Sequence, residues 1–146
     1  MKTLGIGLIG SCFMWLCHVN AYNSIASIFE VSSRPVLKIL ADATPELASQ
    51  QAKALQFEQS TEDWQELVNH PEVDVVDITA PNHLHHPIAV AALNLGKPVY
   101  CEKPLACTLA EAEEMADLAK AQQIPTLAGY NYLQNPLMKT AREIVQ

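Results

Sequence analysis

The sequence predicts an α/β fold built on a doubly wound parallel sheet. Strand and helix signals alternate along the chain, as a parallel sheet with crossover helices requires. The segment 73–78 is a run rich in β-branched residues, which is typical of a strand buried on both faces. A first strand over 4–9 leads into a glycine-containing turn and then a helix.

The bulk composition is that of one globular domain. The chain has 146 residues, of which 49% are hydrophobic, so it can bury a proper core. Its net charge of −7 disfavours a nucleic-acid partner, and the sequence has no apolar run of about 18 residues that would span a membrane. The four cysteines lack CxxC spacing, and we interpret them as reduced thiols of a cytoplasmic protein.

The N-terminus admits two interpretations. Lys2, the apolar stretch behind it and the small-residue segment 19–21 resemble a secretory leader, in which case the protein is secreted. Alternatively, residues 4–9 form a buried strand and the following residues, to about 29, form a helix. We favour the strand and helix, because removing the segment would delete the central strand of the predicted sheet.

Capping residues and apolar periodicity place the other elements. Pro45 opens a helix, Thr108 and Glu111 form a capping box, and Ser60 with Asp63 resembles another. The expected strands are 4–9, 36–41, 73–78, 98–101 and 125–128, and the later helices are 45–55, 60–69, 85–95, 108–122 and 136–146. Because the chain stops inside a helix, we expect the front part of a longer protein: a domain over 1–128, and the start of a connection to a second domain over 129–146.

The turn after the first strand resembles a dinucleotide-binding turn that has lost two glycines. Such a turn requires Gly-x-Gly-x-x-Gly, and counting from Gly10 places Cys12 and Trp15 at the second and third positions. Cys12 is small enough to be tolerated, whereas overpacking of the kind expected at Trp15 costs about 1–3 kcal/mol. Asp42 ends the second strand, where an acid would bind an adenosine ribose and favour NAD over NADP; a simple turn aspartate before Pro45 is the alternative.

Polar loops follow the predicted strands 73–78 and 98–101. The loop 79–87 contains Asn82 and three histidines but neither a carboxylate nor a cysteine to complete a metal site, so we expect a ligand-binding loop and no metal. In the second loop, Pro104 restricts the backbone and fixes Glu102 and Lys103 at a strand end. Ligands of open α/β sheets bind at such ends, although this pair alone could be a surface salt bridge.

Three motifs together resemble one enzyme family. They are Ala80-Pro81-Asn82-x-x-His85, Glu102-Lys103-Pro104-Leu105-Ala106 and Gly129-Tyr130-Asn131-Tyr132, in this order. They are similar to the N-terminal half of the glucose–fructose oxidoreductase and inositol 2-dehydrogenase (Gfo/Idh/MocA) family, over nearly the whole chain. The resemblance implies a Rossmann-like domain binding NAD, with NADP less favoured. It also implies a second α/β domain with the substrate site and usually the oligomer interface, and hydride transfer between nicotinamide and a sugar, inositol or related polyol.

The resemblance also assigns roles by position. Lys103 would be the catalytic residue, hydrogen-bonded to the reacting oxygen. The cofactor-binding residues would be Gly10, Ser11, Cys12, Phe13 and Met14 at the pyrophosphate, Asp42 at the adenosine ribose, Ala80, Pro81, Asn82 and His85 around the nucleotide cleft, Glu102 at the nicotinamide ribose and Asn131 near the nicotinamide. The family's acid–base histidine would lie in the second domain. We therefore expect the cofactor-binding part of a dehydrogenase, inactive alone, with an inactive binding module as the alternative.

Overall fold

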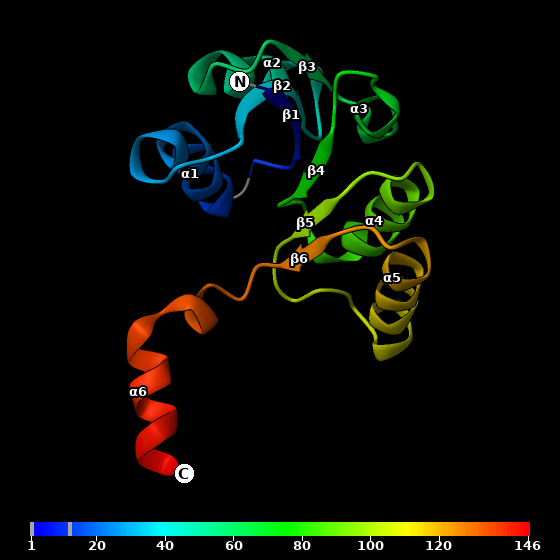
Figure 1. Ribbon diagram of the computed structural model, residues 1–146. Coiled ribbons are helices and arrows are strands. Elements are labelled where there is room, and N and C mark those ends of the chain that lie inside the picture. Colours follow the sequence, from blue (N-terminus) through cyan, green and yellow to red (C-terminus); the bar gives the residue numbers. More distant parts are fainter. Residues whose placement is uncertain (1, 12) are drawn as a thin grey trace.

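The computed structural model describes residues 2–11 and 13–146 (Figure 1). Their strands form one six-stranded sheet. The strands are β1 (Lys2–Ile9), β2 (Ser33–Ala41), β3 (Gln59–Thr61), β4 (Val75–Ile78), β5 (Val99–Cys101) and β6 (Thr126–Ala128). All pair in parallel in the order β3-β2-β1-β4-β5-β6. The chain thus runs outward from β1 to one edge and returns to build the other half from β4, which confirms the doubly wound prediction and the central place of the first strand.

Helices cover both faces of this sheet. They are α1 (Phe13–Ile28), α2 (Pro45–Leu55), α3 (Trp64–Asn69), α4 (His85–Asn94), α5 (Leu109–Gln122) and α6 (Pro136–Val145), with short 3₁₀ turns η1 (Asn82–Leu84) and η2 (Asn131–Gln134). In Figure 1, α1 lies on one side of the sheet, α4 and α5 lie on the other, and α6 extends away from the body. None of the helices described is both long and apolar enough to cross a membrane.

Two helices begin where the sequence predicts, at Pro45 and just after Thr108. The Thr44 side chain accepts a hydrogen bond from the Leu47 amide at the start of α2, with Pro45 in the first turn. At α5, the Thr108 hydroxyl accepts from the Glu111 amide at 3.3 Å, and the Glu111 carboxylate accepts from the Thr108 amide at 2.9 Å. These reciprocal bonds confirm the predicted capping box and satisfy amides that the first turn of a helix leaves free.

The predicted helix over 60–69 is wrong in its first half. Ser60 lies in the edge strand β3, where Gln59–Thr61 pairs with the end of β2, so its backbone hydrogen bonds run to a strand. Asp63 is the residue that caps α3, accepting from the Gln65 amide at 2.8 Å, and the helix begins only at Trp64. The polar character of β3 hid the strand, since an exposed edge strand needs no apolar alternation.

The core has one apolar layer on each face of the sheet. One layer joins α1 and α2 to β1 and β2, and the other joins α3, α4 and α5 to β4 and β5. Successive β1 residues serve different layers, because side chains along a strand alternate between faces: Leu8 packs into the first layer and Ile9 into the second. The loops at the carboxyl ends of the strands lie outside these apolar layers and carry polar residues.

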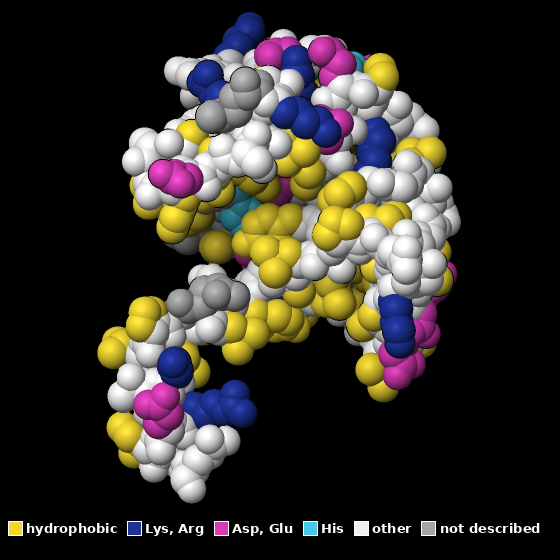
Figure 2. Space-filling model, in the orientation of Figure 1, with side chains coloured by type: hydrophobic (Ala, Val, Ile, Leu, Met, Phe, Trp, Pro, Cys, Tyr) yellow, Lys and Arg dark blue, Asp and Glu magenta, His cyan; other side chains and the backbone are white. Residues whose placement is uncertain are grey.

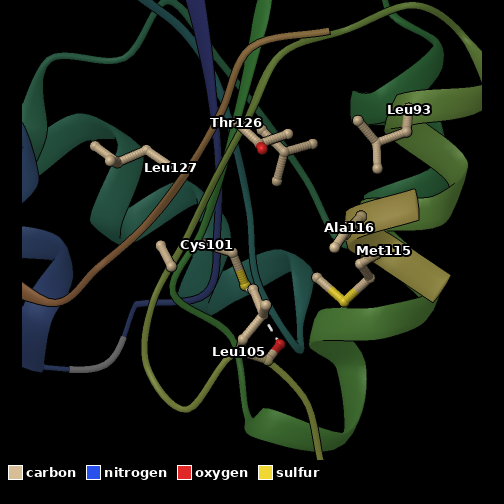
Figure 3. A pocket seen from close by; sticks show the side chains of 10 residues that line it. Leu93, Cys101, Leu105, Met115, Ala116, Thr126 and Leu127 are labelled. Atoms are coloured by element: carbon tan, nitrogen blue, oxygen red, sulfur yellow. Dashed lines mark hydrogen bonds between the residues drawn. The ribbon is translucent and has the colours of Figure 1, made fainter. Parts of the chain in front are cut away.

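A small apolar cavity lies at the β6 edge of the sheet. Figure 3 shows side chains around it from α4, α5, β5 and β6, among them Leu93, Met115 and Cys101. Its volume is about 90 Å³, and its lining, as far as the structure describes it, is apolar apart from the Thr126 hydroxyl and the Cys101 thiol. Burial, with the charges of Asp77 and Glu102 behind it, raises the pKa of the Cys101 thiol to about 12, so this thiol is protonated at neutral pH. The cavity is a packing gap without groups suited to catalysis.

Shortening Val99 should enlarge this gap and destabilise the fold. Val99 is buried and lines the cavity from β5, so Val99→Ala removes two methyl groups and should lower the unfolding free energy by about 2 kcal/mol. Val145→Ala is the matched control, because Val145 on α6 is 87% exposed and should change little. Urea unfolding of both variants makes the measurement, and equal losses would contradict the packing described here.

Candidate functional site

A groove of two adjoining cavities crosses the carboxyl ends of the central strands. The larger, of about 370 Å³, lies over the ends of β1, β2 and β4. The smaller, of about 270 Å³, lies over the ends of β4 and β5. Ala80 lines both, just beyond β4. This is the position beside β1 where the strand order reverses, which is where open α/β sheets bind ligands.

The turn after β1 passes close over the end of β4. The Gly10 amide donates to the Ala41 carbonyl at 2.9 Å, and the Thr79 hydroxyl donates to the Gly10 carbonyl at 2.7 Å. Gly10 has φ +93°, and a Cβ placed on it would lie 2.6 Å from Ala80 Cα. The backbone therefore makes a tight left-handed turn at the floor of the groove.

The predicted residues after Gly10 divide between the two cavities. Ser11 lines the larger cavity and Met14 the smaller. Phe13 is the first residue of α1, and Cys12 lies outside the described residues. Trp15, which stands where the third glycine was expected, is partly buried and packs against the apolar layer beneath α1. The large side chain thus occupies the space between the helix and the sheet.

Asp42 lines the larger cavity and carries an unpaired, buried carboxylate oxygen. Its Oδ1 accepts from the Ala43 amide at 2.7 Å, whereas its buried Oδ2 has no hydrogen-bond partner among the described residues. A buried oxygen without a partner is costly, and a ligand hydroxyl could satisfy it. Glu62 is the second carboxylate of the lining, whose described residues include neither lysine nor arginine. Leu47 and Trp64 add apolar surface.

The three histidines after β4 diverge. His83 lines the larger cavity, and His86 contacts a Glu114 oxygen at 2.9 Å. His85 is buried, and its ring nitrogens lie 2.8 Å from the Ala80 carbonyl and 2.9 Å from that of Pro104. His85 therefore ties the loop after β4 to the loop after β5.

Asn82 and Pro81 contribute to the groove from the same loop. The Asn82 amide donates to Cys107 Sγ at 3.1 Å, and its buried Oδ1 is unpaired among the described residues, at the smaller cavity. Pro81 lines the larger cavity. Asn131 differs from them: it lies exposed in η2 beyond β6, and the linings of the two cavities do not include it.

Glu102 and Lys103 lie at the edge of the smaller cavity. Glu102 is buried, and its Oε2 accepts from the Lys103 amide at 3.0 Å. Lys103 is exposed and lines the cavity together with Pro104. The Glu102 carboxylate faces inward to His18 at 3.2 Å, so the pair is not the surface salt bridge considered as the alternative.

Sequence reasoning missed two polar residues beneath this site. His18 on α1 and Asp77 on β4 are both buried and hydrogen-bonded to each other. A signal for them was present, because Asp77 interrupts the apolar run 73–78, and a buried carboxylate requires a partner. The partner lies 59 residues earlier in the chain, so spacing alone could not identify it.

The curated proteins that resemble this chain include two named dehydrogenases. The chain is 41% identical to levoglucosan dehydrogenase from Pseudarthrobacter phenanthrenivorans, over 100% of this chain and 38% of the relative. It is 34% identical to inositol 2-dehydrogenase from Salmonella paratyphi B, over 78% of this chain and 31% of the relative. The chain thus spans only about a third of the length of these proteins.

Solved structures repeat the fold closely. An NAD binding oxidoreductase from Klebsiella pneumoniae superimposes with a TM-score of 0.90 at 45% identity, covering 98% of this chain and 38% of the other. Levoglucosan dehydrogenase in complex with NADH and levoglucosan superimposes with a TM-score of 0.87 at 43% identity. The match covers 90% of this chain and 36% of the other.

A family profile matches most of the chain. It is that of GFO_IDH_MocA, described as an oxidoreductase family with an NAD-binding Rossmann fold, and the match covers residues 4–130. The sheet order and the groove at its switch point agree with that description. The chain therefore belongs to the Gfo/Idh/MocA oxidoreductase family, whose NAD-binding Rossmann domain it contains.

Proposed function

We propose that this chain is the NAD-binding portion of a dehydrogenase acting on a sugar, inositol or related polyol. The observation that carries the proposal is the unpaired Oδ2 of Asp42, buried in the wall of the larger cavity. A carboxylate at the end of the second strand accepts hydrogen bonds from adenosine ribose hydroxyls in dinucleotide-binding sheets. Gly10 and Ser11 line the larger cavity just before α1 begins, and a helix N-terminus is a favourable place for a pyrophosphate.

The larger cavity suits the adenosine half of NAD. Gly10, Ser11, Cys12, Phe13 and Met14 would contact the pyrophosphate, and Ala80 and Pro81 would line the cleft. Trp64 and Leu47 supply apolar surface for an adenine ring. The extra phosphate of NADP would face the carboxylates of Asp42 and Glu62, and no lysine or arginine stands among the described residues of the lining, so NAD is favoured.

The smaller cavity would hold the nicotinamide end. Glu102 would bind the nicotinamide ribose, and Asn82, His85 and Asn131 would shape or border this end. When bound, NAD supplies a nicotinamide ring that exchanges a hydride with a substrate carbon. Lys103 would hydrogen-bond the reacting oxygen and stabilise the negative charge that develops there, so it is the catalytic residue we propose.

The substrate class rests on the relatives, which are named for levoglucosan and inositol. We propose that residues 129–146 lead to a second domain that recognises such a substrate and supplies the acid–base group. Leu137, Ile144 and Val145 on α6 are exposed, and Figure 2 shows hydrophobic side chains gathered on the side of the body that faces this helix. A homo-oligomeric assembly in the cytoplasm, in keeping with the free thiols of Cys17 and Cys107, is part of the proposal.

A second candidate is a binding module without activity. It is favoured by the departures at Cys12 and Trp15, where dinucleotide-binding turns carry glycine. A module that kept the fold and lost the cofactor would still have the sheet and the groove. Cofactor affinity separates the two candidates.

Removing the Asp42 carboxylate should weaken NADH binding selectively. Hydrogen bonds to a charged group contribute about 1.5–3 kcal/mol, so Asp42→Ala should raise the Kd for NADH about 10- to 150-fold. The wild-type chain should bind NADPH more weakly than NADH, and the variant should narrow that difference. Fluorescence titration of NADH and NADPH measures both quantities.

Glu46→Ala is the control, because Glu46 is an exposed acid of α2 outside the lining of the groove. It should leave both affinities unchanged. A wild-type chain that binds neither dinucleotide would support the inactive module. Equal affinities for NADH and NADPH would contradict the role given to Asp42.

A further inference from the structure

His18 lies between two carboxylates beneath the smaller cavity. Its Nδ1 is 2.9 and 3.0 Å from the two oxygens of Asp77, and its Nε2 is 3.2 Å from Glu102 Oε1. His18 comes from α1, Asp77 from β4, and Glu102 from the end of β5. All three side chains are at most 7% exposed, so this is a buried ionic network spanning three elements.

Two tyrosines complete the surroundings of the histidine. The Tyr22 hydroxyl, one turn along α1, donates to Asp77 Oδ2 at 2.9 Å. The Tyr100 ring on β5 stacks on the imidazole with a centroid distance of 4.6 Å and an interplanar angle of 1°. The ring plane and both ring nitrogens of His18 are therefore fixed by contacts to β4, to β5 and to the residue that follows β5.

The geometry calls for a positively charged histidine. An ionised carboxylate only accepts hydrogen bonds, so both ring nitrogens must donate, and only the imidazolium can do so. Burial lowers the pKa of His18, but the hydrogen bonds and charges of Asp77 and then Glu102 outweigh it and raise the pKa above 6.5. The imidazolium also offsets the repulsion between the two buried carboxylates.

Glu102 is the member of the network that reaches the cavity. Its Oε1 contacts His18, and its Oε2 accepts from the Lys103 amide at 3.0 Å. The Gly129 backbone lies against the same carboxylate, and a Cβ on Gly129 would lie only 2.6 Å from Glu102 Oε1. The carboxylate is thus confined to one position at the cavity edge, next to the Lys103 backbone.

We propose that His18 is a positioning residue, which holds the Glu102 carboxylate in place for the nicotinamide ribose. The proposal rests on the function proposed above, because it assumes that a dinucleotide occupies the groove. His18 acts through Glu102 and does not touch the ligand, and Asp77 anchors it from behind. Its loss should affect the nicotinamide half of the cofactor and spare the adenosine half.

The test compares NADH with ADP, which lacks the nicotinamide riboside. His18→Gln keeps a hydrogen-bonding side chain without the charge, and it should raise the Kd for NADH about ten- to a hundredfold while leaving that for ADP within about twofold. Val19→Ala is the matched control, because Val19 is the next residue of α1, is buried, and packs into the apolar layer that joins α1 and α2 to β1 and β2. It should disturb α1 packing without changing the ratio of the two affinities.

A pH series adds a readout that a packing role would not move. In the wild type, the NADH-to-ADP affinity ratio should fall as the pH rises through the raised pKa of His18, and the ratio should be flat in His18→Gln. A nuclear magnetic resonance titration of the wild-type imidazole needs no variant. NADH should shift the His18 signals and ADP should leave them unchanged.

The outcomes separate the two proposals. Equal weakening of NADH and ADP in His18→Gln, or no weakening of either, would overturn the positioning role while leaving NAD binding intact. Identical shifts of the His18 signals by both ligands would also overturn it. Absence of both NADH and ADP binding in the wild type would overturn the proposed function, and the positioning role with it.

Discussion

Gly10→Ala should destabilise the fold by about 4 kcal/mol and abolish detectable NADH binding. Two costs combine at this position. A non-glycine residue at φ +93° carries backbone strain of about 1–3 kcal/mol. The added Cβ would also lie 2.6 Å from Ala80 Cα and 2.7 Å from Ala80 N, and overpacking of this kind costs about 1–3 kcal/mol more.

Relief of that contact requires the end of β4 to move away from the turn. Ala80 lines both cavities, so the displacement would change the groove itself. The hydrogen bond from the Thr79 hydroxyl to the Gly10 carbonyl would lengthen with it. The loss of affinity and the loss of stability should therefore occur together in this variant.

Gly96→Ala separates strain from contact. Gly96 also has a positive φ, of +74°, but a Cβ there would meet nothing within 4 Å. This variant should lose about 1 kcal/mol and bind NADH as the wild type does. Urea unfolding and NADH titration of both variants make the comparison. Equal losses of stability and equal NADH affinities in the two variants would show that the close approach of Gly10 to Ala80 contributes nothing to either quantity.

Much of the fold could be predicted because local signals agreed with the tertiary structure. Pro45 and the Thr108–Glu111 capping box mark the starts of α2 and α5 with side-chain chemistry that acts within one turn. The apolar run that contains β4 reflects burial on both faces. The edge strand β3 gave no such signal, because its residues are polar and largely exposed, and its pairing with β2 depends on tertiary structure.

The candidate site was predictable where its residues follow directly from strand ends. Asp42, Asn82 and Lys103 lie where three strands finish, and the parallel sheet brings those ends together. The layer beneath could not be predicted in the same way. His18 reaches Asp77 and Glu102 across 59 and 84 residues, and such pairing depends on how α1 lies against the sheet.

Asp77→Ala should be the most destabilising change beneath the site, at about 3–5 kcal/mol. Asp77 is fully buried, and removing one partner of a buried ion pair leaves the other charge uncompensated. Here the remaining groups would be the His18 cation, held by Glu102 alone, and the Tyr22 hydroxyl without its acceptor. Glu72→Ala is the control: its salt bridge with Lys38 lies on the surface, and surface pairs contribute about 0–1 kcal/mol.

The pH dependence of stability should reveal the same network. The pKa of His18 is raised in the folded protein, so its stabilisation is complete below pH 6.5 and is lost as the pH rises through the folded value. Burial raises the pKa of Asp77 as well, and His18 and Tyr22 offset only part of that rise, so the free energy of unfolding also falls as the pH rises in the acidic range.

Above pH 6.5 the slope of the unfolding free energy against pH that one proton can cause cannot exceed about 1.4 kcal/mol per pH unit. Asp77→Ala should flatten this slope, because it removes the partner that most raises the His18 pKa. Urea unfolding from pH 6 to 9 measures this slope. An unchanged slope in Asp77→Ala would mean that a group other than His18 binds the proton.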